Sequence, residues 1–156
     1  MNNFRVNPIN SKSIKSMMNS ILSGFTFFFL ISTILNGQDN MPDWNVNPSL
    51  YEHSGSITSS VILGNDFTSS EGDMLGAFYG DEIRGLTSGL YFPPGDIVLF
   101  LVTVYGYEGE SLTFQYYNLE TDTVYDLNET IDFSPNMLIG TPFAPFEFTS
   151  NNVDCN

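Results

Sequence analysis

The segment GDMLGAFYGDEIRG, residues 72–85, is the clearest indication of the fold, because it has the pattern of two short β-strands joined by a tight turn. Gly80 and Asp81 separate two runs rich in residues that favour strands. Glycine accepts the positive φ that a two-residue hairpin turn requires. We therefore predict a β-hairpin here, within an antiparallel sheet.

The register of this hairpin predicts the surroundings of Arg84. The expected pairs are Tyr79 with Glu82, Ala77 with Arg84, and Leu75 with Leu86. Opposite the small Ala77, the Arg84 side chain has room to fold over the Tyr79 ring and to reach Asp73 on the same face. We expect a structural ion pair of Arg84 with Asp73 or Glu82.

The rest of the chain predicts an all-β domain. Beyond residue 37, lysine is absent and alanine and glutamine are rare, whereas short runs of Val, Ile, Thr, Tyr and Phe alternate with Gly, Pro, Asn and Asp. The expected strands are residues 55–63, 73–79, 82–87, 97–105, 111–117, 122–127, 129–133 and 144–149. Residues 93–95 and 134–143 are expected to be loops. This spacing favours an antiparallel β-sandwich, Ig-like or jelly-roll-like, of about eight strands.

The chain divides into four predicted parts: a signal peptide (1–37), an extended lead-in (38–54), the β-sandwich (55–150) and a tail (151–156). Three basic residues precede an apolar run from Ile21 to Leu35, which is the pattern of a secretory signal peptide. This run is shorter than the roughly 20 residues of a membrane-spanning helix. We expect cleavage after Gly37 and export to the extracellular space or cell surface, with the periplasm, or an uncleaved N-terminal anchor, as alternatives.

The net charge of the chain limits the classes of partner that it can bind. It has 18 acidic residues against 4 Lys and Arg, for a net charge of −14. Without residues 1–37, all 18 carboxylates remain with a single cation, Arg84, and the net charge becomes −17. Such a surface repels nucleic acid, whereas 42% hydrophobic residues argue against a disordered acidic chain. We expect no nucleic-acid partner and no membrane span after cleavage.

A tryptophan in the lead-in, the hairpin segment, an LTF-x-Y motif and a TVYDL element form a pattern that resembles a known type of module. The matching residues are Trp44, Asp73, Gly76, Ala77, Phe78, Glu82, Arg84, Gly85, Leu112, Thr113, Phe114, Tyr116 and 124–127. They resemble extracellular β-sandwich modules in secreted and surface proteins of Bacteroidetes-type bacteria, often found beside a type IX secretion sorting tail. The resemblance implies the fold and export, and it is compatible with adhesion or glycan binding.

Arg84 has two interpretations. It either forms the internal ion pair or clamps a carboxylated or sulfated ligand. Because it is the one cation among many carboxylates beyond residue 37, we favour the internal ion pair.

An oxygen-rich loop suggests calcium as a cofactor. Asn65, Asp66, Glu71 and Asp73 supply the ligand type that calcium prefers, although their spacing is not that of an EF-hand. The alternative is a set of solvated loop carboxylates.

Aromatic side chains suggest a second kind of site. Flat rings can stack on sugar faces, and the candidates for such a platform are Trp44, Tyr51, Tyr79, Tyr91 and Tyr107. The alternative is that these rings pack in the core or across strands.

These observations favour a non-catalytic, secreted binding or adhesion module for carbohydrate or cell-surface matrix, with calcium as a candidate cofactor. One alternative is a structural spacer or assembly module that pairs with other protein chains, and another is a small glycan-active enzyme using two carboxylates. His53 is the only histidine, which disfavours a nucleophilic triad. Cys155 is the only cysteine and leaves an interchain disulfide open.

Overall fold

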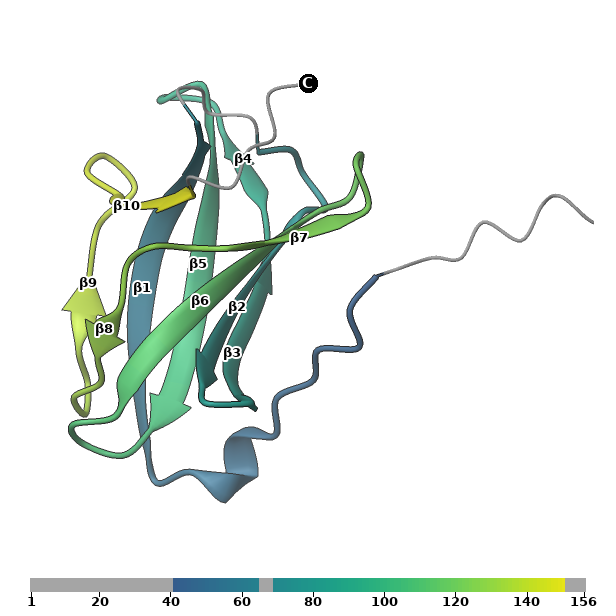
Figure 1. The fold of residues 1–156 in the computed structure, drawn as a ribbon. Coiled ribbons are helices and arrows are strands. Elements are labelled where there is room, and N and C mark those ends of the chain that lie inside the picture. Colours follow the sequence, from purple (N-terminus) through teal and green to yellow (C-terminus); the bar gives the residue numbers. More distant parts are fainter. Residues whose placement is uncertain (1–40, 65–68, 151–156) are drawn as a thin grey trace, which may run out of the picture. The chain divides into compact units, whose positions relative to one another are not determined.

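Ten β-strands form the body of the computed structural model, which describes residues 41–64 and 69–150 (Figure 1). The elements are a 3₁₀ turn η1 (Pro48–Leu50) and strands β1 (His53–Leu63), β2 (Met74–Tyr79), β3 (Glu82–Ser88), β4 (Leu90–Phe92), β5 (Ile97–Gly106), β6 (Ser111–Asn118), β7 (Thr123–Asp126), β8 (Ile131–Asp132), β9 (Leu138–Ile139) and β10 (Phe146–Ser150). The described residues contain no α-helix. All of them lie in one unit, Asn40–Asn156.

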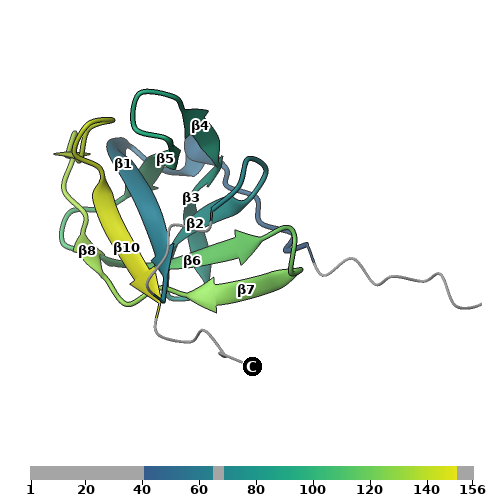
Figure 2. The same ribbon diagram turned by 90° about the horizontal axis from the view of Figure 1, so that it is seen from above.

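The strands form two sheets that pack face to face. The first sheet has the order β10-β1-β5-β4, with β9 also paired to β1, and the second has the order β3-β2-β6-β7, with β8 paired to β6. Figure 2 shows these sheets as two layers. The pairs of β1 with β9 and β10 are parallel, and the other strand pairs are antiparallel. The predicted β-sandwich is therefore confirmed.

All eight predicted strands occur, with ends that differ by at most two residues from the prediction. Two short strands were missed. β4 has three residues directly before Pro93, and β9 has two residues inside the segment 134–143 that we predicted as loop. Both strands are too short for a run of β-favouring residues to stand out, and only pairing with a longer neighbour defines them.

Aromatic pairs bridge the two sheets. Phe100 of β5 meets Tyr116 of β6 with ring centroids 5.9 Å apart, and Phe114 of β6 meets Phe148 of β10 at 4.3 Å. Each such ring removes a large apolar area from water and so stabilises the packing of the two sheets. All four rings are buried.

The described part of the segment before β1 packs along the sandwich. The Trp44 ring lies edge-on to Phe78, with centroids 5.4 Å apart. The Asn47 side chain accepts a hydrogen bond from the Ser49 backbone N–H at 3.2 Å and so caps η1. Tyr51 then stacks on Tyr105 at the end of β5, with centroids 6.2 Å apart. These contacts hold the segment before β1 at a fixed position.

The β2–β3 hairpin forms at the predicted turn, but its predicted register is wrong beyond the first pair. The observed pairs are Tyr79 with Glu82, Phe78 with Ile83, Ala77 with Gly85, and Leu75 with Thr87. A β-bulge leaves Arg84 as an extra residue without a partner in the ladder, so neither the Ala77–Arg84 pair nor the Leu75–Leu86 pair forms. Gly80 takes the positive φ, 58°, that the turn requires.

Candidate functional site

The β-bulge presents Arg84 to one end of the sandwich. Gly85 must come close to β5, because a Cβ at this position would lie 2.6 Å from the Thr103 carbonyl oxygen. Arg84, the bulged residue, therefore lies between the hairpin, the end of β5 and the segment before β1. These three pieces meet at the bottom of Figure 1.

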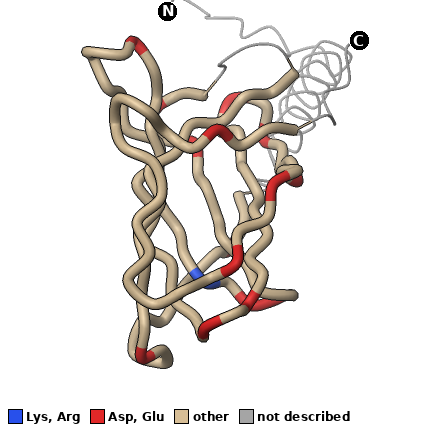
Figure 3. Tube along the Cα trace, turned by 90° about the vertical axis from the view of Figure 1, so that its left-hand side faces the viewer, with Lys and Arg blue, Asp and Glu red and all other residues tan. Residues whose placement is uncertain are grey.

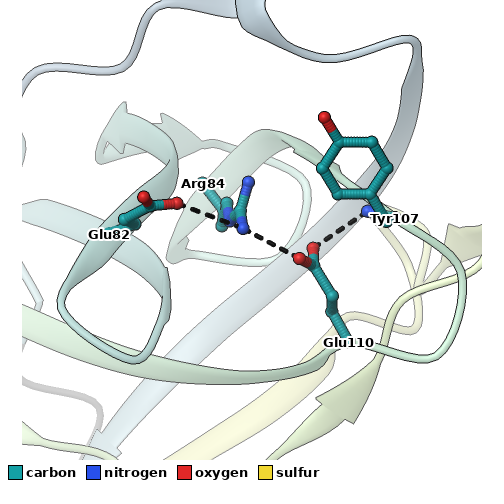
Figure 4. A network of polar contacts seen from close by, with 4 residues as sticks. All are labelled: Glu82, Arg84, Tyr107 and Glu110. Atoms are coloured by element: carbon teal, nitrogen blue, oxygen red, sulfur yellow. Dashed lines mark hydrogen bonds and ion pairs between the residues drawn. The ribbon is translucent and has the colours of Figure 1, made fainter.

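Two carboxylates contact the Arg84 guanidinium (Figure 4). Nη2 donates to Glu110 Oε1 at 2.8 Å and lies 3.2 Å from Glu82 Oε2. The Arg84 side chain is 4% exposed and that of Glu110 is 11% exposed, whereas Glu82 is 70% exposed. The Glu110 pair is thus buried, and a buried charge of this kind requires its partner.

Glu110 is itself positioned by the β5–β6 loop. Its Oε2 accepts a hydrogen bond from the Tyr107 backbone N–H at 2.9 Å. Gly106 allows this approach, because a Cβ there would lie 2.6 Å from the same oxygen. Glu110 was not predicted as a partner of Arg84, since nothing in the sequence distinguishes it from the other carboxylates.

Two tyrosine rings cover the guanidinium. The Arg84 Cζ lies 4.5 Å from the centroid of Tyr51 and 5.4 Å from that of Tyr79. Its Nε and Nη1 are buried and have no hydrogen-bond partner. The electron-rich ring faces compensate part of that loss, because a cation within about 6 Å of a ring centroid is attracted to it.

Four tyrosines gather around this arginine, and we call Tyr51, Tyr79, Tyr105 and Tyr107 the tyrosine end. Tyr51 contacts Tyr105 and Tyr107, each with a centroid distance of 6.2 Å. Tyr79 joins the group through Arg84. Tyr79 and Tyr107 remain 45% and 52% exposed. The tyrosine end therefore combines a buried cation, fixed rings and two half-exposed ring surfaces.

The structure brings together three of the five aromatic residues proposed for a platform, namely Tyr51, Tyr79 and Tyr107. Trp44 packs on Phe78 instead. Tyr91 lies on β4, which pairs with the first residues of β5, so it is at the opposite end of that strand. The Asp96 carboxylate accepts a hydrogen bond from the Tyr91 hydroxyl at 2.8 Å, and this bond raises the pKa of Tyr91.

Of the two carboxylates expected to pair with Arg84, Glu82 contacts it and Asp73 does not. The Asp73 carboxylate is fully buried and accepts hydrogen bonds from the backbone N–H groups of Ser70 at 2.6 Å and Leu119 at 2.9 Å, and from the Tyr116 hydroxyl at 2.5 Å. The reason is the bulge, which removes Arg84 from the predicted register. Burial, followed by the hydrogen bond to Asp73, raises the pKa of Tyr116 well above its ordinary value.

The proposed calcium ligands are only partly described. Asn65 and Asp66 lie outside the described residues, as do the predicted signal peptide and Cys155. Glu71 accepts a hydrogen bond from the Tyr91 backbone N–H at 3.3 Å, and both oxygens of Asp73 accept bonds from protein groups. Within residues 41–64 and 69–150, no group of three or more His, Cys, Asp or Glu side chains is arranged to hold a metal ion.

The fold and the site define an acidic β-sandwich with a tyrosine-lined end. Comparison of the chain with protein-family models, with curated proteins and with solved structures finds no match. The resemblance to secreted modules thus stays a prediction. Among the residues that the structure describes, no helix is long and apolar enough to cross a membrane.

Proposed function

We propose that this protein is an exported, non-catalytic binding module that holds carbohydrate or cell-surface matrix at its tyrosine end. The observation that carries the proposal is the pair of half-exposed rings, Tyr79 and Tyr107, at the same buried Arg84 cluster. Tyrosine offers a large, rigid contact area at a low entropic cost, and its hydroxyl can form hydrogen bonds.

Rigidity supports this role. Tyr107 is held by the edge-on contact of its ring with Tyr51 and by the hydrogen bond from its backbone N–H to Glu110. Tyr79 flanks the Arg84 guanidinium. Rings that are ordered before binding lose little conformational entropy when a sugar stacks on them.

The same contacts favour a non-catalytic module over a glycan-active enzyme. Glu82 and Glu110 are the two carboxylates closest to the buried cation, and both contact the same Arg84 nitrogen. Glu110 also accepts the Tyr107 backbone N–H, so its oxygens are engaged by protein groups, which suits a structural pair better than a carboxylate that acts on a glycosidic bond.

A glycan array, run with added calcium and with chelator, tests the proposal. Binding of the folded protein to a class of saccharides supports adhesion, and dependence on calcium supports a role for that cation. Release of shortened saccharides from the bound glycans would favour the enzyme. No binding under either condition would contradict the proposal.

The alternative function, an assembly module, is favoured by a separate surface. Leu138 and Phe143 are each 83% exposed, and Leu138 borders a pocket of about 280 Å³ lined by Ser54, Gly55, Ser56, Asn136, Met137 and Leu138. An exposed apolar side chain at the rim of a pocket offers a contact to another protein chain. Sedimentation of the wild type and of Leu138→Lys, with the exposed Leu50→Lys as control, tests this alternative. Self-association that only Leu138→Lys abolishes would support assembly.

A further inference from the structure

We infer that the tyrosine end selects saccharides that carry protonated amines and rejects acidic ones; this inference rests on the proposed function. Beyond residue 37, Arg84 is the only Lys or Arg. Its guanidinium is buried and is already contacted by two carboxylates and two rings. A carboxylate or sulfate on a ligand would therefore find no lysine or arginine to pair with.

Exposed carboxylates flank both half-exposed rings. Glu82 is the cross-strand partner of Tyr79, and Asp81 in the adjoining turn is also exposed. Glu108 is exposed and directly follows Tyr107. Figure 3 shows the acidic positions around Arg84 at this end of the trace. Charge at the tyrosine end thus repels anions and attracts cations.

Arg84 illustrates the recognition that we infer. Its guanidinium lies against Tyr51 and Tyr79 while two carboxylates neutralise its charge. An ammonium group on a sugar can make the same two kinds of contact from outside, with the exposed part of Tyr79 or Tyr107 and with Glu82 or Glu108.

Three short saccharides of matched length distinguish the charge classes. The probes are tetramers of glucosamine, N-acetylglucosamine and galacturonic acid, titrated calorimetrically at about pH 5.5, which is above the pKa of an ordinary carboxyl group. We expect the glucosamine tetramer to bind at least about threefold more tightly than the acetylated one, and the acidic tetramer to bind most weakly. Raising NaCl from about 20 mM to about 300 mM should reduce this preference.

A matched pair of variants separates a local effect from the attraction of any polycation to an acidic protein. Glu82→Gln removes a carboxylate beside Tyr79, whereas Glu147→Gln removes an exposed carboxylate on β10, which pairs with the far end of β1. We expect Glu82→Gln to weaken binding of the glucosamine tetramer about threefold and to leave the affinity for the acetylated tetramer unchanged. Glu147→Gln should change neither.

Equal losses in the two variants would overturn the inference, because the attraction would then be spread over the whole surface. Tighter binding of the acidic or the acetylated tetramer would also overturn it, while leaving carbohydrate binding itself in place. If the protein binds none of the three tetramers and no glycan on the array, that result would instead contradict the proposed function.

Discussion

Arg84 is the side chain that joins the carboxylates and the rings of the tyrosine end. One of its nitrogens contacts two carboxylates, and its remaining polar nitrogens rely on the rings of Tyr51 and Tyr79. The sequence singled out Arg84 as the sole cation beyond residue 37 and suggested Glu82 as a partner. It could not identify Glu110, because that contact depends on how the β5–β6 loop folds.

Replacement of this arginine tests its structural role. We expect Arg84→Ala to lower the free energy of unfolding by about 3 kcal/mol, because Glu110 would remain buried without its partner. Arg84→Lys should lower the free energy of unfolding by less, since lysine keeps the positive charge although it lacks the planar guanidinium group. Urea denaturation measures both. An unchanged stability of Arg84→Ala, combined with lost carbohydrate binding, would assign Arg84 to ligand contact instead.

The Tyr116 hydroxyl stabilises the buried Asp73 carboxylate. We expect Tyr116→Phe to lower the free energy of unfolding by about 1–2 kcal/mol near neutral pH, because Asp73 loses a hydrogen-bond donor. The pKa of Tyr116 is raised in the folded state, so its contribution is full below the ordinary tyrosine pKa of 10.0 and declines as pH rises through the folded value.

Denaturation of the wild type and of Tyr116→Phe between about pH 8 and pH 11.5 tests that dependence. The difference in unfolding free energy between the two proteins should narrow above about pH 10. A difference that stays constant across this range would show that the Tyr116 hydroxyl does not titrate as the structure implies.

The β2–β3 hairpin shows what a strand pattern reveals and what it leaves open. The turn at Gly80 and the pairing of Tyr79 with Glu82 follow from residue types. The bulge at Arg84 does not, because it arises where Gly85 approaches the other sheet. Packing between sheets, rather than local preference, therefore sets the register and the face on which Arg84 lies.

Gly85 is the position where this approach is most easily blocked. We expect Gly85→Ala to lower the free energy of unfolding by about 2 kcal/mol, since its methyl group would clash with the Thr103 carbonyl and the Val102 and Val104 side chains. Gly80→Asn is the matched control, because a Cβ there meets open space and asparagine tolerates positive φ. Equal stability of Gly85→Ala and the wild type would contradict the close packing of β3 on β5.

The fold class of the described residues could be predicted from the sequence, whereas the candidate site could be predicted only in part. Short runs of β-favouring residues predicted eight strands and the sandwich. Five aromatic candidates were named because their rings can stack on sugars, yet only the fold gathers Tyr51, Tyr79 and Tyr107 and separates Tyr91. Tyr105 joins the group because its ring stacks on Tyr51.

The net charge of −17 for residues 38–156 predicts a response to ions. Repulsion among carboxylates destabilises the folded state, so we expect the melting temperature to rise when NaCl increases from about 20 mM to about 300 mM. Calcium added at constant ionic strength should raise it further if calcium assists the module. Coincident melting curves with calcium and with chelator would remove calcium from the proposal.

The central claim is that carbohydrate binds at the tyrosine end. Calorimetric titration of the best array ligand into the wild type, Tyr79→Ala/Tyr107→Ala and Tyr91→Ala tests it most directly. Tyr91 is 45% exposed, like Tyr79, but lies at the opposite end of β5. We predict that the double variant loses at least about tenfold in affinity while staying folded, and that Tyr91→Ala binds like the wild type. Undiminished binding by the double variant, or an equal loss in Tyr91→Ala, would contradict the account.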